Sequence, residues 1–256
     1  MKSIITIILI LSSTFTFGQN LKFKIVGQKD TTVNLVRYFG KGLYYADTAE
    51  MKNGVVEFDG TKQKPGILAL FLPGQKMLEF IYNKEDVYIE ASLVDLMGSA
   101  KVKKSEENKI FSEYVKFVNM ERNKANNLVE RRKAVKAESS EYKQLTDQID
   151  ATTKKVIAYQ TSIVENNWDM LVSRVIKMSM DIVIPEAPKD ENGVIIDSSF
   201  RFSYFRDHYF DNIDLKDDRL VRTPIYHNKL EKYFGKTMMI QHWDTVVKYA
   251  FQLCDQ

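Results

Sequence analysis

The single cysteine, Cys254, is the first residue to consider as a reactive group. Thiol-disulfide exchange of the thioredoxin kind uses a Cys-x-x-Cys pair, in which the pKa of the first thiol is lowered. Because the sequence holds one cysteine, it contains neither such a pair nor an intramolecular disulfide. A lone thiol could pair between chains or serve as a redox group, and it could equally pack as a small apolar residue.

A second group of reactive side chains surrounds His208. The neighbouring acids are Asp207, Asp211, Asp214, Asp217 and Asp218. Their spacing matches neither a calcium-binding loop, which needs acidic ligands at alternate positions followed by glycine, nor a His-x-x-x-His zinc pair. His227 and His242 lie far away in the sequence, without a cysteine or acidic motif that would link them to a zinc site. We therefore expect a surface acidic turn and no metal site.

The segment 200–210 is a third candidate, because large aromatic side chains are concentrated there. They are Phe200, Phe202, Tyr204, Phe205, Tyr209 and Phe210, interleaved with Arg201, Arg206, Asp207 and His208. Aromatic rings bury much area and keep polar groups, so the segment could line a ligand pocket. The commoner arrangement is a core that locks a helix against the rest of its domain, and we prefer that interpretation.

Motifs of the common enzyme classes are missing from the sequence. It contains no Gly-x-Ser-x-Gly, no phosphate-binding loop and no Gly-x-Gly-x-x-Gly. The sequence therefore assigns no catalytic, cofactor-binding or metal-ligating residue. With 44% hydrophobic and 28% charged residues, the composition excludes a disordered chain and fits a globular protein of one or two domains.

Two basic clusters could bind an acidic partner or an anionic lipid headgroup. They consist of Arg131, Arg132, Lys133 and Lys136, and of Lys101, Lys103 and Lys104. Glu130, Glu138 and Glu141 are interleaved with the first cluster at spacings suited to helical ion pairs, so a solvated helix face is the preferred interpretation. A net charge of +3 and the lack of a recognised binding motif argue against nucleic acid.

Residues 1–18 have the layout of a secretory signal peptide, which we expect to be cleaved near Gly18. Lys2 supplies a positive start, and an apolar run from Ile4 to Leu11 follows it. That run is shorter than the roughly 20 apolar residues of a membrane-spanning helix. No cysteine lies near this point, so we expect no lipid-modified N-terminus. No other stretch is apolar enough to span a bilayer, which predicts a mature protein that is soluble in the periplasm or cell envelope.

From about Leu21 to Lys103, short β-type runs alternate with turn residues, as in an antiparallel sandwich. The expected strands are Leu21–Val26, Thr32–Phe39, Leu43–Ala46, Val55–Phe58, Ile67–Leu72, Met77–Tyr82 and Val87–Ala91. Asn53 and Gly54 form a favourable hairpin turn before the fourth of these runs. About 80 residues can close a small core, so this part could fold alone.

Glycine and proline vanish between Ser105 and Met180, which predicts helices. A heptad seam runs through Tyr142, Leu145, Ile149, Thr152, Val156, Tyr159 and Ile163, and a weaker one through Ile110, Tyr114, Phe117, Leu128 and Val135. Polar Glu121, Lys124 and Arg131 occupy the missing positions of the weaker seam. Ser139 and Ser140 stand where a cap would begin the second helix. We expect an antiparallel helical hairpin with its tip near 137–141, and a coiled-coil dimer is the alternative.

Further helices are expected after the hairpin. We expect Asn167 to cap a third helix, and Pro185 and Pro188 to close that section. The segment Thr245–Leu253 has the pattern of an amphipathic helix and lacks a stop signal such as glycine or proline, so we expect the chain to continue. The fold class is therefore α+β: a signal peptide at 1–18, a β-sandwich domain at 19–104, and a helical domain with an aromatic-rich C-terminal segment at 105–256.

Two sets of residues in this chain form recognisable patterns. The first set is Asp47-Thr48, Asn53-Gly54, Phe58, Gly60, then Ser105, Glu107 and Asn108 before a helix with Tyr114 and Phe117. The second set is Pro185, Pro188, Tyr204 to Ile213, Asp218-Arg219-Leu220, Arg222-Thr223-Pro224, Leu230 and Tyr233. Lys104 stands where the first pattern has glycine.

Together these patterns resemble the N-terminal region of exported thiol-disulfide oxidoreductases of Bacteroidota, in which two domains of unknown function precede a thioredoxin-like domain. The resemblance implies redox chemistry in that last domain, at a Cys-x-x-Cys motif that is missing here. No active-site residue is therefore transferred to this sequence, and Cys254 does not take that role.

Three functions remain as hypotheses. The preferred one is an exported, non-catalytic scaffold or partner-binding module of an envelope redox protein, whose partner is a thioredoxin-like domain or another envelope protein. The second is a truncated oxidoreductase whose Cys-x-x-Cys domain lies beyond Gln256. The third is a periplasmic protein that binds a ligand through the aromatic segment 200–210.

Overall fold

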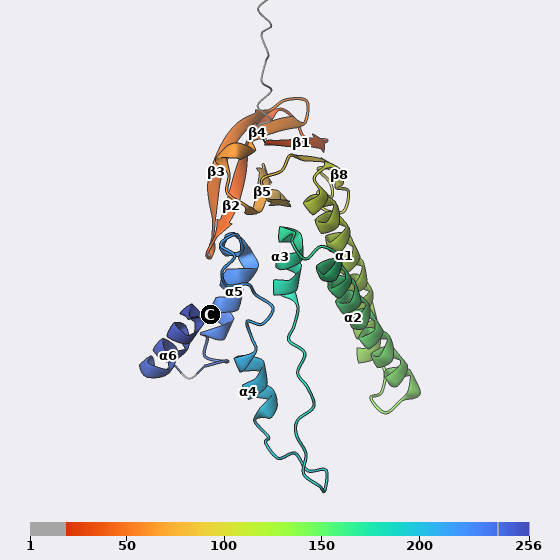
Figure 1. Ribbon diagram of the computed structural model, residues 1–256. Coiled ribbons are helices and arrows are strands. Elements are labelled where there is room, and N and C mark those ends of the chain that lie inside the picture. The colour runs from red at the N-terminus through yellow and green to blue at the C-terminus, as the bar shows by residue number, and fades with distance from the viewer. Residues whose placement is uncertain (1–18, 240, 256) are drawn as a thin grey trace, which may run out of the picture.

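The computed structural model describes residues 19–239 and 241–255. The expected signal peptide at 1–18 lies outside the described residues. Figure 1 shows two β-sheets at one end of the molecule, with the helices extending away from them. The predicted α+β class, with a β-rich N-terminal part followed by helices, is confirmed.

Two four-stranded sheets form the β-rich part. The first contains, in spatial order, β4 (Val55–Asp59), β1 (Asn20–Val26), β7 (Val87–Ser92) and β8 (Lys101–Lys104). The second contains β3 (Gly42–Met51), β2 (Thr31–Phe39), β5 (Gly66–Leu72) and β6 (Lys76–Tyr82). All seven expected strands are present, and β8 is an additional short strand that pairs with β7.

Two features of the sheets differ from the expectation of an antiparallel sandwich with short strands. β1 and β7 pair in parallel, whereas the other pairs are antiparallel. β3 continues past the expected end at Ala46 to Met51, and a register shift between Leu35 and Val36 of β2 accommodates this longer pairing. Pairing with β2 therefore extends β3 through residues whose own β-propensity is low, such as Asp47.

The turn at Asn53-Gly54 leads from one sheet to the other, because β3 and β4 belong to different sheets. Both residues have positive φ, 52° and 74°, as a tight hairpin turn requires. Lys52 and Val55 close the turn with two backbone hydrogen bonds of 2.9 Å. A Cβ atom at Gly54 would lie 2.6 Å from the carbonyl oxygen of Ile25, so glycine is needed for the close approach to β1.

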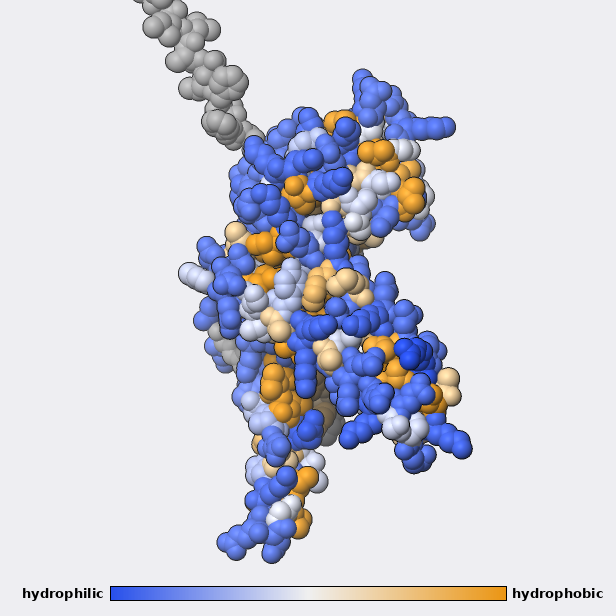
Figure 2. Space-filling model, turned by 90° about the vertical axis from the view of Figure 1, so that its right-hand side faces the viewer, coloured by the Kyte–Doolittle hydropathy of each residue, from blue (hydrophilic) through white to orange (hydrophobic). Residues whose placement is uncertain are grey.

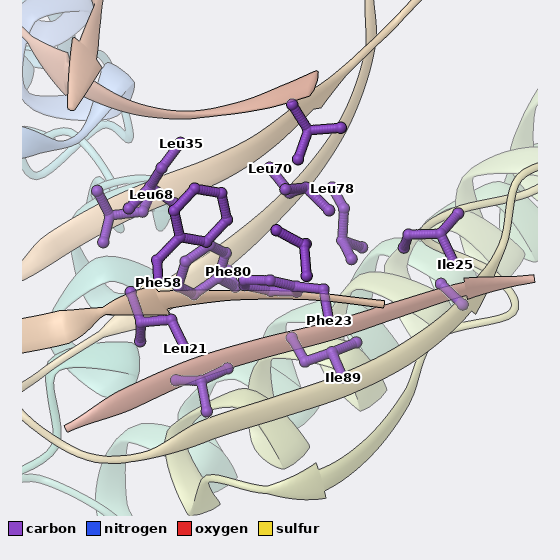
Figure 3. Packing of buried hydrophobic residues seen from close by; sticks show 14 of the residues in the cluster. Leu21, Phe23, Ile25, Leu35, Phe58, Leu68, Leu70, Leu78, Phe80 and Ile89 are labelled. Carbon is purple, nitrogen blue, oxygen red and sulfur yellow. The ribbon is translucent and has the colours of Figure 1, made fainter. Parts of the chain in front are cut away.

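The sandwich core lies between the two sheets, where alternate side chains of each strand face each other. Phe23 of β1 packs against Phe80 of β6, with 5.0 Å between ring centroids, and against Phe58 of β4 at 6.5 Å. Figure 3 shows these rings surrounded by leucine and isoleucine side chains from both sheets. Phe23 and Phe80 are fully buried, so the core is closed at its centre.

The outer face of the second sheet is covered by helices, and this contact forms a second core. Ile67 of β5 and Ile81 of β6 belong to it, together with Leu171, Val172 and Ile176 of α3 (Leu171–Ser179). β5 is apolar along its length because it is covered on both faces. The second core therefore contains residues of the β-sandwich as well as residues of the helices that follow residue 104.

The long helices α1 (Glu106–Lys133) and α2 (Ser140–Asn166) form the predicted antiparallel hairpin. Ser105 and Ser139 cap them, and each accepts a hydrogen bond from a backbone N–H three residues on. The prediction that Asn167 caps the third helix was wrong. Asn167 ends α2, where its backbone and side-chain N–H groups both donate to the carbonyl of Ile163, and α3 begins four residues later.

After α3 the chain runs without a helix to α4 (Phe200–Asp207), in a section that contains Pro185 and Pro188. The helices α5 (Pro224–Tyr233) and α6 (Trp243–Cys254) follow. Thr223 caps α5 and Pro224 occupies its first turn, a favourable start for a helix. The predicted C-terminal helix is confirmed, and Val246, Tyr249 and Leu253 of α6 pack against the second core.

The start of α1 is the junction between the sandwich and the helices. The side-chain amide of Asn108 forms two hydrogen bonds with the backbone of Ile81, as a neighbouring strand would. It accepts from the N–H of Ile81 at 2.8 Å and donates to the carbonyl of Ile81 at 2.7 Å. The carboxylate of Glu107 accepts from the N–H groups of Leu171 at 3.0 Å and Val172 at 2.6 Å. Asn83 also donates to Glu107, at 2.8 Å. One buried carboxylate thus caps α3, which has no capping side chain of its own.

A second junction joins β5 to the segment before α5. Arg222 donates through Nε to the carbonyl of Pro65 at 2.5 Å. Gly66 has a φ of 153°, and a Cβ atom there would lie 2.6 Å from the Cβ of Arg222. The two segments of the chain can approach this closely only because residue 66 has no side chain.

We predict that Glu107→Gln lowers the free energy of unfolding by about 2–3 kcal/mol. The exchange replaces an acceptor oxygen by an amide donor that faces the N–H groups of Leu171 and Val172, and it removes the charge that caps α3. Chemical denaturation measures the loss. Glu106→Gln is the control, because Glu106 is exposed and pairs with Lys109 on the same helix. Equal stability of the two variants would contradict the capping role.

We predict that Gly66→Ala destabilises the protein by more than Gly74→Ala does. Both glycines have positive φ, so both variants strain the backbone, but nothing lies within 4 Å of a Cβ at Gly74. The added clash with Arg222 should make the difference at least about 1 kcal/mol. Thermal melting of the two variants gives the comparison, and equal melting temperatures would argue against the close packing.

Candidate functional site

A cleft lies along the helical hairpin, beside the chain that follows α3. It has a volume of about 630 Å³. Its wall is formed by Tyr114, Val118, Glu121, Arg122 and Ala125 of α1, by Thr152, Thr153, Val156, Ile157 and Gln160 of α2, and by residues 179–183. We call it the hairpin cleft. Its size is that of a small-molecule or side-chain binding site.

Glu121 is the unusual residue of the hairpin cleft. It is only 6% exposed, and its Oε2 atom is buried without a hydrogen-bond partner among the described residues. The neighbouring polar side chains donate their hydrogen bonds to other acceptors. Gln160 donates to the hydroxyl of Tyr114 at 2.9 Å, and Thr152 donates to the carbonyl of Ile149 at 2.7 Å. A buried carboxylate without a partner is costly, so the group is available to a ligand that donates hydrogen bonds.

The sequence signal for Glu121 was its place in the weaker heptad seam, where a polar residue interrupts the apolar repeat. Lys124 and Arg131, which interrupt the same seam, are exposed. Periodicity alone does not distinguish them, because a long side chain at a seam position can turn outward to water. The cleft was not foreseen, since it also needs residues 179–183, which are distant in the sequence.

The aromatic segment 200–210 divides between core and surface. Tyr209 and Phe210 are buried in the second core against Tyr233, at ring separations of 5.5 Å and 4.7 Å. Phe202 is exposed. Phe205 and Tyr209 also line a cleft of about 240 Å³ with Lys229, whose pKa is lowered by burial. A second cleft of about 570 Å³ includes Phe210 and Tyr233.

The acids near His208 form ion pairs with neighbouring basic side chains. His208 contacts Asp211 through Nδ1 at 2.7 Å, and Arg206 contacts Asp207 at 2.8 Å. The other pairs are Arg174 with Asp214 and Asp217, Arg219 with Asp217, and Arg222 with Asp218. Throughout the described ranges, no group of three or more His, Cys, Asp or Glu side chains could hold a metal ion.

The basic clusters are also partly paired. Lys133 lies 2.8 Å from Glu130, and Arg132 lies over the ring of Tyr142 at the hairpin tip. Lys104 pairs with Asp86 at 2.6 Å and Lys103 with Glu90 at 3.6 Å. These contacts favour a solvated, ion-paired surface over a dedicated anion site at both clusters. Figure 2, which views the side of the molecule that carries the hairpin, shows a mostly hydrophilic surface with small, separate apolar patches.

A hollow of about 450 Å³ beside the β2–β3 turn combines cations and aromatic rings. It is lined by Arg37, Tyr38, Phe39, Tyr44, Lys64 and Arg222. Tyr38 donates to Glu79, and burial raises the pKa of the Tyr38 hydroxyl. Arg222 donates its hydrogen bonds to the carbonyl of Pro65 and to Asp218. The other two cations that line this hollow, Arg37 and Lys64, are exposed on the surface.

Cys254 lies at the end of α6 and is exposed. The alternative of a buried apolar cysteine is therefore wrong. Among the helices that the structure describes, each is too short or too polar to cross a lipid bilayer.

Comparison with known families agrees with the N-terminal part of this structure. Residues 20–111 match the family described as "Domain of unknown function (DUF4369)", from β1 to the first turns of α1. The expectation of a domain of unknown function is thereby confirmed for this part of the chain. No curated protein and no solved structure matches the chain.

We predict that Asp217→Asn lowers the free energy of unfolding by about 2 kcal/mol near neutral pH. Burial raises the pKa of Asp217, but hydrogen bonds from Arg219 and the charges of Arg219 and Arg174 outweigh it and hold the pKa below its usual value. The stabilisation is therefore complete above a pH of about 4 and is lost as the pH falls through the folded-state pKa.

Urea unfolding at about pH 7 and about pH 3 measures this difference, which should shrink in acid. Asp218→Asn is the control, because the carboxylate of Asp218 is exposed and its pair with Arg222 should contribute little. A difference that stays constant with pH would show that Asp217 stabilises the fold without its charge.

Proposed function

We propose that this protein is an exported, non-catalytic binding module of the cell envelope that acts beside a thioredoxin-like domain. The observation on which the proposal depends is the junction at Ser105–Asn108, which joins a sandwich and a helical layer into one scaffold with shaped clefts on its surface. A scaffold of this kind positions a partner and presents a binding surface.

Two further observations support a partner. The match of residues 20–111 to a domain of unknown function agrees with the resemblance to the N-terminal region of envelope oxidoreductases. In addition, α6 keeps Trp243 77% exposed and Phe251 68% exposed, while its other face packs on the second core. Exposed aromatic side chains on a docked helix are suited to contact with a further domain.

A redox role within this chain would require a different chemistry from that of thioredoxins. One thiol can form a mixed disulfide, but release of the bound partner then needs a second thiol. Cys254 is the one cysteine of the sequence, and the truncated-oxidoreductase hypothesis places the Cys-x-x-Cys pair beyond Gln256. Reading the coding sequence downstream of Gln256 separates that hypothesis from a free-standing module.

Ligand binding by the aromatic segment is the second candidate function. The two clefts that Phe205, Tyr209 and Phe210 help to line favour it. Thermal-shift screening against envelope metabolites and peptides tests it, and uniformly unchanged melting temperatures would count against it.

We predict that this chain does not reduce insulin above the background of dithiothreitol alone. The insulin-reduction assay, with thioredoxin as the positive control, measures the rate. Cys254→Ser should behave like the unaltered protein, because Cys254 has no second thiol in this chain to release a mixed disulfide faster than dithiothreitol does. Clear turnover that disappears in Cys254→Ser would overturn the non-catalytic assignment.

A further inference from the structure

We propose that the hairpin cleft binds a guanidinium group carried on an alkyl chain, with Glu121 as its counter-ion. The inference is independent of the proposed redox partnership, because it depends only on the residues of the cleft. It assigns a ligand class to a surface that neither the family match nor the resemblance describes.

The Glu121 carboxylate is the first feature of the cleft that favours a cation. The described residues bury its Oε2 atom but give it no donor, and the nearby donors of Gln160 and Thr152 are directed to other oxygens. Burying an unpaired carboxylate is unfavourable, so a donor supplied by a ligand would be bound favourably. A neutral donor satisfies the hydrogen bond alone, whereas a cation also satisfies the charge.

Glu107, on the same helix as Glu121, is a buried glutamate whose carboxylate has a full set of hydrogen-bond donors within the protein. It is as deeply buried as Glu121, yet its two oxygens accept three hydrogen bonds, from Asn83, Leu171 and Val172. Two glutamates of one helix are therefore buried to the same degree, and only the one in the cleft lacks a partner.

The surrounding wall of the cleft also favours a cation that is carried on an alkyl chain. Val118, Val156 and Ile182 offer apolar surface suited to the methylene groups of an alkyl chain. Asp181 adds a second carboxylate to the lining. The one cation among the lining residues is Arg122, which is exposed, so the charge balance of the cleft favours a positive ligand.

The test begins with the unaltered protein and isothermal titration calorimetry. The probes are n-butylguanidinium and its neutral counterpart n-butylurea, which has nearly the same shape. A capped Ala-Arg-Ala peptide and its citrulline counterpart repeat the comparison for a peptide side chain. We expect the charged member of at least one pair to bind and its neutral member to bind at least about tenfold more weakly.

The two pairs distinguish the source of the cation. Binding of n-butylguanidinium without the peptide indicates a small free cation, and binding of the arginine peptide indicates a side chain of a partner. If no charged probe binds, or if the neutral probes bind equally well, the proposal is wrong.

Glu121→Gln and its control Glu113→Gln locate the site. Each removes one negative charge from α1, but Glu113 is exposed and does not line the cleft. Glu121→Gln should weaken binding at least about tenfold, and Glu113→Gln by less than about twofold. Thermal melting confirms that both variants are folded, and equal affinity of Glu121→Gln and the unaltered protein would overturn the assignment.

Discussion

The capping of α3 by the carboxylate of Glu107 is the contact on which the helical half of this structure depends. The N-terminus of α3 is buried, and its first N–H groups have no acceptor within the helix. Glu107 supplies that acceptor from α1, while Asn108 beside it is bonded to both backbone groups of Ile81 in β6. Two adjacent residues thereby fix α1 and α3 against the same sheet, and the second core forms around α3.

Local patterns in the sequence were sufficient for many elements of this fold. The strand runs, the turn at Asn53-Gly54 and the capping serines Ser105 and Ser139 depend on neighbouring residues, so their chemistry is visible in a short window. The parallel pairing of β1 with β7 depends on residues distant in the sequence, and the short strand β8 forms by pairing with β7. Asn167 was misplaced for the same reason, because the cap of α3 comes from Glu107, more than sixty residues away.

The candidate site was harder to foresee than the fold. Glu121 was visible as a polar interruption in a heptad seam, but Lys124 and Arg131 interrupt the same seam and are exposed. Burial of Glu121 depends on how α2 and residues 179–183 lie against α1. The aromatic segment was easier to interpret, because the density of large aromatic residues indicated core packing, which Tyr209 and Phe210 provide. The surface clefts beside this segment also need Lys229 and Tyr233 of α5, which the segment itself does not reveal.

The length of the helical hairpin has a consequence for local stability. Its base is fixed to the sandwich by Asn108 and by Lys116, which donates to the carbonyl of Ala100 at 2.5 Å. Farther out, α1 and α2 are held mainly by each other, through Leu128, Leu145 and the seam between them, and Figure 1 shows this part extending away from the sheets. Fraying that starts at the tip therefore leaves the sandwich intact, and amide hydrogens should exchange with solvent in an order that runs from the tip toward the base.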